Sequence, residues 1–276
     1  MARAARHTGE QHRVRTTIAL LTDFGSLDQY VASMKAVMLS LNPSLQLVDI
    51  THQILPYRIR EAAYVLWSVY NYFPQGTIFV NVVDPGVGSG RRILVMKTKK
   101  YTFIAPDNGL LDFVLYQEKN ATAVEVTQAS LKKYAIGEIS STFHGRDLMA
   151  PLAAYLANEV PIRQFGTPYT LPEILSPFVR TRADVVSPCI FHIDNYGNII
   201  TNLRSFEMEK SMKAIQTISV GSNMVSKWIR IYDEAPENTP CLIVGSSGLV
   251  EISAKNNSAA RLLHASLESK VKVYWR

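Results

Sequence analysis

The hydrophobic positions in the first part of the chain alternate between short apolar runs and stretches with helical spacing. Apolar, β-branched runs at 18–21, 45–50 and 77–83 have the length and composition of buried parallel strands. Between them, apolar residues recur at helical spacing over 31–41 and 60–72, and a proline ends each pattern. Strands that alternate with helices predict an α/β N-terminal domain whose central, mostly parallel sheet has helices on both faces.

The pattern changes after residue 91. Two strand-like runs, 92–98 and 101–105, lie close enough together to predict a β-hairpin. A helix, a strand and a second helix, which Pro151 would delay or bend, are expected next, at 110–116, 123–126 and 146–157.

Helical periodicity is lost between Arg163 and Pro188, where four prolines predict a linker. Beyond it, short runs with little helix predict a small antiparallel β-barrel-like C-terminal domain, with strands at 189–193, 199–203, 215–220, 228–232, 241–244 and 271–275. We therefore expect a disordered basic tail, an α/β domain, a linker and a β domain, at 1–16, 17–165, 166–188 and 189–276.

Composition narrows the class of protein. With 47% apolar and 19% charged residues, a well-packed soluble protein is expected, and no apolar run approaches the length that spans a membrane. Of the net charge of +6, half lies in the tail, where four arginines stand against one glutamate, which disfavours a nucleic-acid-binding role for the folded part. Two isolated cysteines fit a cytoplasmic protein, although an arginine-rich tail is also compatible with organellar targeting.

Four polar clusters follow predicted strands, at 22–26, 84–91, 107–109 and 142–147. An aspartate in such a place usually caps a helix or a turn, but ligands of open α/β sheets also bind where the strands end. The glycines of the second cluster have G-x-G-x-G spacing and precede a strand, which disfavours a dinucleotide site. Four clusters at one edge of a sheet predict a small-molecule site.

Three side chains from these clusters have the chemistry needed to position and activate a water molecule. A lone histidine such as His144 is a buried structural residue as often as a functional one. Together with Asp84 and Arg91, however, it could orient a water and stabilise charge, with its ring held in one tautomer. In the C-terminal part, Asp194-Asn195-Tyr196-Gly197-Asn198 is either a hairpin turn or a second group of ligand contacts, and the sequence leaves both open.

Taken together, the motifs resemble the S-adenosylmethionine (SAM) hydroxide adenosyltransferase family, which is related to the SAM-dependent fluorinase and chlorinase. The resemblance runs from Ile18 to the C-terminus and rests on LLTDFGSLDQYV, VVDPGVGSGRR, IAPDNGLL, TFHGRD, DNYGNIITN and GSSGLVEISAKNNSA. It implies hydrolysis of SAM to adenosine and L-methionine without a metal or another cofactor. It also implies a homotrimer whose active sites lie between the N-terminal domain of one subunit and the C-terminal domain of the next.

The resemblance also assigns residues. Asp84, Arg91 and His144 would form the catalytic set, with His144 or a hydroxide paired to Arg91 handling the proton. Asp23 would hold the ribose hydroxyls, Asp194 and Asn198 the methionine or ribose, and Tyr196 would pack on the adenine. Further substrate contacts would come from Asp107, Asn108, Phe143, Ser246, Ser247, Asn256 and Asn257. The halogenases carry a tyrosine in place of Asp84 and a serine in place of Gly145, so a halide site would be poorly formed here.

Three other functions remain open. A SAM-dependent halogenase-like activity is the nearest. A metal-dependent nucleotidase could gather Mg²⁺ or Mn²⁺ among carboxylates and His144, namely Asp23, Asp28, Asp84, Asp107 and Asp147. A protein that binds adenosine or SAM without turning it over would have the same motifs.

Overall fold

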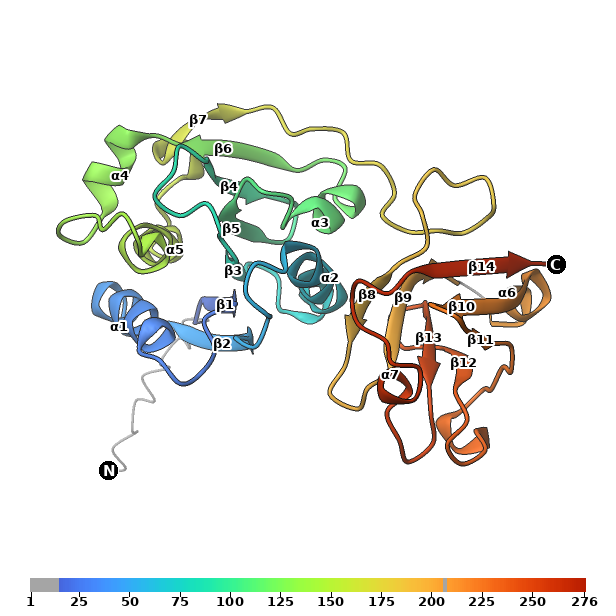
Figure 1. Ribbon diagram of the computed structural model, residues 1–276. Helices are drawn as coiled ribbons and strands as arrows, with labels where there is room; N and C mark the ends of the chain where they lie inside the picture. The colour runs from blue at the N-terminus through green and yellow to red at the C-terminus, as the bar shows by residue number, and fades with distance from the viewer. Residues whose placement is uncertain (1–14, 206–207) are drawn as a thin grey trace, which may run out of the picture. The chain divides into compact units, whose positions relative to one another are not determined.

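The computed structural model describes residues 15–205 and 208–276 (Figure 1). The expected disordered tail, 1–16, lies outside these residues apart from its last two, so it stays a prediction. The chain divides into two compact units, which we describe separately. The first contains the chain up to Tyr57 together with 73–107 and 120–170, and the second contains 58–72, 108–119 and 171–276.

The first unit is built on a seven-stranded sheet with the order β2-β1-β3-β5-β4-β6-β7 (Figure 1). The pairs among β2, β1, β3 and β5 are parallel. Strand β4 is antiparallel to both β5 and β6, so β6 runs in the direction of β5 and five of the seven strands point one way. The strands are β1 Thr17–Thr22, β2 Gln46–Thr51, β3 Ile78–Val82, β4 Ile93–Lys97, β5 Thr102–Pro106, β6 Thr122–Val126 and β7 Gly166–Tyr169.

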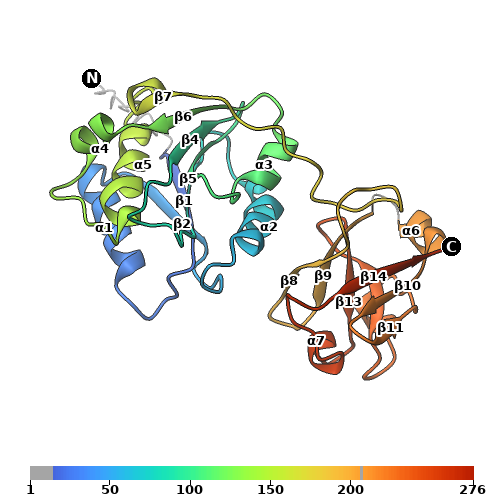
Figure 2. The same ribbon diagram turned by 45° about the horizontal axis from the view of Figure 1, so that its top comes forward.

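Three helices of this unit pack on one face of the sheet, as Figures 1 and 2 show. They are α1 (Tyr30–Leu41), α4 (Gln128–Tyr134) and α5 (Ala150–Ala157). Met34 and Met38 of α1 are fully buried against alternate strand residues such as Ile18 and Leu20. Successive side chains of a strand point to opposite faces of the sheet, so every second one enters the layer between the sheet and these helices. β-branched and leucine residues therefore occupy the positions that point into this layer.

The parallel pairing of β1 with β3 places two predicted polar clusters side by side. Thr22, the last residue of β1, pairs with Val82, the last residue of β3. The backbone N–H of Asp23 then donates to the Val82 carbonyl at 3.4 Å. Asp23 and Asp84 therefore emerge at the same edge of the sheet, although sixty residues of chain separate them.

The second unit contains antiparallel strands, as expected for the C-terminal domain, arranged as two sheets. A four-stranded sheet has the order β12-β13-β9-β8 and a three-stranded sheet the order β11-β10-β14. The described strands form no closed barrel. They are β8 Ile190–Ile193, β9 Ile199–Arg204, β10 Ile215–Val220, β11 Asn223–Val225, β12 Cys241–Val244, β13 Leu249–Ser253 and β14 Val271–Trp275.

Four helices belong to the same unit: α2 (Ile59–Val69), α3 (Asp112–Gln117), α6 (Met208–Ala214) and α7 (Ala259–Leu262). Short 3₁₀ turns occupy Tyr70–Tyr72 and Tyr232–Glu234 of this unit and Ile162–Gln164 of the first unit. The side chain of Phe191 on β8 packs against Tyr64 of α2, with ring centroids 5.7 Å apart. Aromatic packing of this kind ties α2 to the four-stranded sheet.

The structure confirms the hairpin predicted at 92–105, because β4 and β5 pair antiparallel around Lys99-Lys100. The strand predicted at 228–232 is wrong. Trp228 makes one isolated bridge to Leu242, and the Glu234 carboxylate then accepts the N–H of Arg230 at 2.7 Å, which turns the chain into a 3₁₀ helix. A local side-chain contact here competes with extended pairing.

Candidate active site

Asp84, Arg91 and His144 are in direct contact in the first unit. Arg91 Nε lies 3.0 and 2.8 Å from the two carboxylate oxygens of Asp84, and its Nη2 bonds to the same carboxylate. The same Nη2 lies 2.9 Å from Nδ1 of His144. The Asp84 and Arg91 side chains are only 5% and 13% exposed, so the ion pair is shielded from water. Arg91 therefore fixes both neighbours at once, in the bidentate geometry that guanidinium favours.

The loop that carries Asp84 and Arg91 is a compact turn. The Val87 N–H donates to the Asp84 carbonyl, and the Ser89 N–H to the Gly86 carbonyl, at 3.2 and 3.0 Å. Gly88 adopts a φ of +77°, and a Cβ there would lie 2.2 Å from the carbonyl oxygen of Ser141. Only glycine lets this loop touch the segment that precedes His144.

His144 stands at the start of a π-helical turn, Gly145–Met149, that leads directly into α5. Such turns often occur at functional sites because they redirect side chains. Burial and the neighbouring Arg91 lower the pKa of His144 below its usual 6.5. Because a guanidinium can only donate, Nδ1 of His144 accepts the bond from Arg91, and the hydrogen of the neutral ring lies on Nε2.

A cavity of about 260 Å³ opens beside this cluster. Asp84 and His144 line it, whereas Arg91 lies behind them. Asp23 and an aromatic wall complete it. The wall consists of Phe24, Tyr30 and Phe143, whose ring centroids are 5.1 to 5.7 Å apart, and the remaining lining comes from Pro56, Tyr57, Val82, Val87, Thr142 and Gly145. Two carboxylates thus share a small cavity with an apolar, aromatic surface.

The carboxylate of Asp23 is held in place by the backbone. The N–H of Tyr57 donates to Oδ2 of Asp23 at 3.2 Å. Burial, and the charge of Asp84, raise the pKa of Asp23 above the usual 3.8, and the Tyr57 bond opposes this rise. Tyr57 itself has a φ of +69°, a left-handed conformation that costs a bulky residue free energy. Its strain is a sign that the backbone at this point serves a function.

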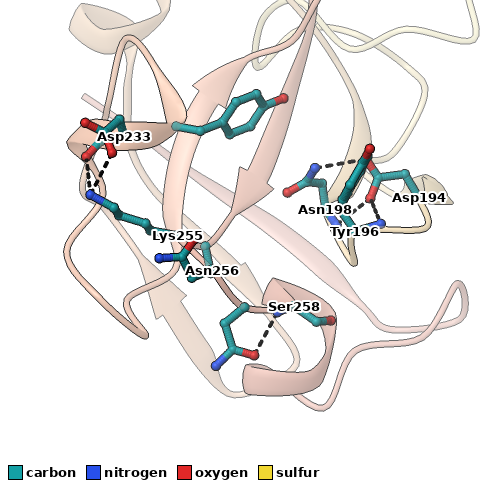
Figure 3. Close-up of a pocket in the computed structure, with 10 residues that line it drawn as sticks. Asp194, Tyr196, Asn198, Asp233, Lys255, Asn256 and Ser258 are labelled. Carbon is teal, nitrogen blue, oxygen red and sulfur yellow. Dashed lines mark hydrogen bonds and ion pairs between the residues drawn. The ribbon is translucent and has the colours of Figure 1, made fainter.

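The second unit has a larger cavity of about 800 Å³ (Figure 3). Five of the predicted substrate contacts line it: Asp194, Tyr196, Asn198, Asn256 and Asn257. The other lining residues are Tyr232 and Asp233, which no motif contains, and Ala254, Lys255 and Ser258, which lie in the motif GSSGLVEISAKNNSA. Lys255 bonds to Asp233 at 2.7 Å across the rim. Asp233 lies in a short 3₁₀ turn, which gives no periodic signal, so the sequence did not point to this residue.

The segment from Asp194 to Asn198 is both a tight turn and part of the cavity wall. Asp194 Oδ1 accepts the N–H groups of Tyr196 and Asn198 at 2.9 and 2.8 Å, and the Asn198 amide donates to Oδ2 at 2.9 Å (Figure 3). Gly197 has a φ of +80°, and a Cβ there would lie 2.0 Å from Oγ of Ser258. This turn leaves the Tyr196 side chain 78% exposed, free to pack on a flat ligand.

A buried carboxylate supports this cavity from behind. Glu251 of β13 is 7% exposed and accepts the hydroxyl of Tyr232 at 3.2 Å. Burial raises the pKa of Glu251, and burial together with Glu251 raises the pKa of Tyr232 to about 12. A glutamate at an inward position of an apolar strand is the feature of the sequence that points to this buried carboxylate.

Four predicted contacts lie elsewhere. Asp107, in the first unit, accepts Arg92 Nε at 2.9 Å and the Tyr169 hydroxyl at 3.0 Å. Asn108 accepts the N–H of Leu110 and so shapes a turn in the second unit. Ser246 and Ser247 form the turn before β13 and do not line the 800 Å³ cavity. Their roles as substrate contacts stay predictions.

Within the residues that the structure describes, no group of three or more histidine, cysteine, aspartate or glutamate side chains is arranged to hold a metal ion. Guanidinium groups already engage the carboxylates of Asp84 and Asp147. Across 15–205 and 208–276, the helices are all too short or too polar to cross a membrane.

The α/β unit with its buried Asp-Arg-His cluster and the β unit with a polar cavity define an enzyme that acts on a small molecule. Two family models match the chain, the SAM hydroxide adenosyltransferase N-terminal domain over 18–166 and the C-terminal domain over 188–272. The chain belongs to the SAM hydroxide adenosyltransferase family.

Similar proteins agree with this assignment. A Thermus thermophilus protein named (R)-S-adenosyl-L-methionine hydrolase is 35% identical, over 89% of this chain and 94% of that protein. One with the same name from Methanocaldococcus jannaschii is 32% identical, over 94% and 95%. A fluorinase of an Actinoplanes species is 29% identical, over 72% and 76%. A crystal structure of an uncharacterized conserved protein from Thermotoga maritima superposes with a TM-score of 0.81 at 30% identity, over 93% and 99%.

Proposed function

We propose that this protein hydrolyses S-adenosyl-L-methionine to adenosine and L-methionine. The observation that carries the proposal is the contact of Asp84, Arg91 and His144 beside a cavity that also holds Asp23. The names of the hydrolases that match over almost the whole chain support the same reaction. The proposed enzyme needs no metal and no redox cofactor, because the ribose 5′ carbon of the substrate already carries a good leaving group.

The reaction exchanges one bond for another. An oxygen of hydroxide, or of a water that gives up one proton to a base, forms a bond to the 5′ carbon, and the bond from that carbon to sulfur breaks. The electron pair of the broken bond stays on sulfur, so methionine leaves as a neutral thioether and needs no acid to protonate it. The enzyme has to place the nucleophile in line behind the carbon, and fixed placement can lower the barrier by about 7–11 kcal/mol.

The hydrogen-bond pattern suggests how each member of the cluster acts. With Nδ1 occupied by Arg91, His144 is set to donate from Nε2 to the nucleophile, and Asp84 is set to accept a hydrogen bond from it. Hydroxide has one hydrogen to donate and lone pairs to accept, so it suits this pair of partners. Arg91 then acts by positioning both side chains. This pattern favours attack by hydroxide over proton removal by His144.

The predicted contacts that line the two cavities bind the substrate in this proposal. Asp23 holds the ribose hydroxyls, and Phe143 forms part of the wall near the 5′ carbon. The cavity of the second unit takes the methionine and adenine portions, with Tyr196 against the adenine ring. As in the arrangement that the family resemblance implies, we propose a homotrimer in which each active site combines the first unit of one subunit with the second unit of its neighbour. Tyr57 lines one cavity and Tyr196 the other, and both are exposed, as is Leu27; such assembly would cover apolar surface of this kind.

Isotope labelling tests the reaction. The protein is incubated with SAM in oxygen-18 water, and the products are analysed by mass spectrometry. Labelled adenosine with unlabelled methionine is expected. Adenosine without label would contradict attack by water, and unchanged SAM would favour the non-catalytic binding protein. A cytoplasmic location is part of this proposal, since SAM is an intracellular metabolite and the two cysteines are free.

A halogenase-like activity is the second candidate, because fluorinases are among the relatives. The residues in the cavity oppose it. Gly145 offers no hydroxyl, and a Cβ there would already lie 3.2 Å from Sδ of Met34. The Asp84 carboxylate can only accept hydrogen bonds, and a halide, unlike hydroxide, has no hydrogen to donate to it. Chloride added to the labelling reaction should therefore give no halogenated nucleoside.

A further inference from the structure

We infer that His52 is a positioning residue, which holds the Asp23 turn in its ligand-binding shape through contacts on both sides of Asp23. This inference rests on the proposed function, since it concerns the residue assigned to the ribose hydroxyls. His52 does not line the cavity and touches no substrate in this scheme. All the groups involved belong to the first unit.

The contacts made by His52 bracket the Asp23 turn. Its Nδ1 lies 2.9 Å from Oγ1 of Thr22, the residue before Asp23. Its backbone carbonyl accepts the N–H of Gly25, two residues after Asp23, at 2.7 Å. Thr22 is fully buried, and the His52 side chain is 10% exposed, so water cannot readily replace either bond.

The direction of these bonds follows from the donors. Thr22 Oγ1 accepts the N–H of Phe24 at 3.3 Å, which leaves its own hydrogen to donate to Nδ1 of His52. The hydrogen of the imidazole then lies on Nε2, which is 3.0 Å from Oδ1 of Asp49, a charge contact without the angle of a hydrogen bond. The bond to Thr22 thus selects the tautomer, and the nearby Asp49 carboxylate favours the same one.

The ring is anchored to helix α1. Asp49 Oδ2 accepts a bond from Nζ of Lys35 at 2.6 Å. Although partial burial acts to raise it, the pKa of Asp49 is lowered by the contacts with Lys35 and His52. The chain of contacts therefore runs from α1 through Asp49 and His52 to Thr22 and the turn. This order of carboxylate, imidazole and hydroxyl fixes the orientation of the His52 ring. An outer carboxylate fixes the ring of a metal-ligating histidine in the same way.

An irregularity in β2 brings these groups into line. Leu20 of β1 pairs with Asp49, but the next residue, Leu21, pairs with Thr51, so Ile50 is an extra residue in β2. Bulges of this kind re-aim side chains next to functional sites. The segment after the bulge then makes two more bonds to the same turn. Gln53 donates to Oγ of Ser26 at 3.0 Å, and the Tyr57 N–H donates to Asp23 itself.

The experiment measures recognition of the ribose hydroxyls by the full-length protein. Binding of adenosine and of 2′,3′-dideoxyadenosine is determined by calorimetry. The Kd of the dideoxy compound divided by the Kd of adenosine is the ratio that reports the hydroxyl contacts, and it falls when these contacts are lost. Asp23→Ala gives the ratio expected when these contacts are lost. His52→Leu and Thr22→Val should weaken adenosine binding about five- to twentyfold and leave the binding of the dideoxy compound nearly unchanged. The ratio in these variants should therefore approach that of Asp23→Ala.

Matched variants separate positioning from general damage. Thr167→Val makes the same change at an exposed residue of β7 and should keep the wild-type ratio. His52→Asn places an acceptor close to the position of Nδ1 and should recover part of the ratio. Asp49→Asn, at a partly exposed side chain, should lower the ratio by about two- to threefold. This variant decides the matter if His52→Leu does not fold.

The outcomes are distinct. A folded His52→Leu that keeps the wild-type ratio, or an equal loss of affinity for both nucleosides, would overturn the positioning role while the proposed function stands. If wild-type protein does not distinguish the two nucleosides, the assignment of Asp23 to the ribose fails, and the inference fails with it. Release of labelled adenosine from SAM by the wild-type protein is measured in parallel and tests the reaction independently of this ratio.

Discussion

Nη2 of Arg91 donates to Nδ1 of His144 at 2.9 Å, so the arginine decides which tautomer the histidine adopts. A neutral His144 carries its hydrogen on Nε2 and can donate to a nucleophile, but in this tautomer it cannot take a proton from one. The same guanidinium binds Asp84. The hydrogen bonds of the cluster therefore decide whether His144 can act as a base, and kinetic measurements can test this.

The pH dependence of kcat separates the two proton routes. The pKa of His144 is lowered below 6.5, so the ring is neutral at pH 7 and above. If hydroxide attacks, kcat should keep rising between about pH 7 and 9, close to tenfold per unit. A stopped-flow or discontinuous assay of adenosine release over this range checks it. A plateau from pH 7 upward would contradict the hydroxide route and point to His144 as the base.

Removal of either cavity-lining member of the cluster should abolish turnover and spare binding. In His144→Ala and Asp84→Ala, adenosine release should fall by about 10²–10⁴-fold, because placement of the nucleophile is lost. The Kd for SAM, measured by calorimetry, should change little. His264→Ala removes an exposed histidine of the second unit and serves as the control. Normal turnover by either cluster variant would rule out the water-placing role.

Gly145→Ser tests whether one side chain separates this enzyme from the halogenases. A Cβ at Gly145 would lie 3.2 Å from Sδ of Met34 and 3.4 Å from atoms of Phe143 and Val82. We expect a loss of about 1–3 kcal/mol in the free energy of unfolding and slower hydrolysis, with no chlorinated nucleoside in chloride. Gly90→Ser is the control, since a Cβ there meets no atom within 4 Å. A chlorinated product would show that Asp84 tolerates halide.

Mixing two inactive variants tests for active sites shared between subunits. Asp84→Ala disables the first unit, and Asp194→Ala disables the second. Unfolding and refolding the two together should restore about a quarter of the wild-type sites in a randomly mixed ring. Each variant refolded alone provides the baseline. No recovery in an assembly shown by light scattering to be trimeric would mean that each site is built from one chain.

Chelation tests the metal-dependent alternative. Adenosine release should be unchanged after dialysis against EDTA, because Arg91 already neutralises Asp84 in the site. Addition of Mg²⁺ or Mn²⁺ to the dialysed protein should likewise have no effect. A loss of activity that either ion restores would favour a metallohydrolase and would require a new account of the cluster.

Much of the fold could be predicted because periodicity is a local property. The run before Asp23 and the run before Asp84 are strands, and their parallel pairing brings both aspartates to one edge. The sequence could not show which side chains of these clusters face the cavity. Asp107 follows a strand in the same way, yet Arg92 and Tyr169 hold it elsewhere. Neighbours distant in sequence make that choice.

Other features left no periodic signal at all. The Ile50 bulge depends on how β2 pairs with β1, and nothing in the local pattern reveals it. His52 directly follows β2, and its contact to Thr22 depends on the pairing of β2 with β1. The short helices α6 and α7 were missed because a helix of one or two turns is stabilised by its tertiary contacts.

Gly88 places an unusual demand on the sequence. Its missing side chain lets the Asp84 loop rest against Ser141, three residues before His144. A single methyl group there would wedge apart the two segments whose side chains meet in the cluster. Gly88 carries no reactive group of its own, yet the distance between Asp84 and His144 depends on its having no side chain. The chemistry of the cluster therefore rests on a residue that takes no part in it.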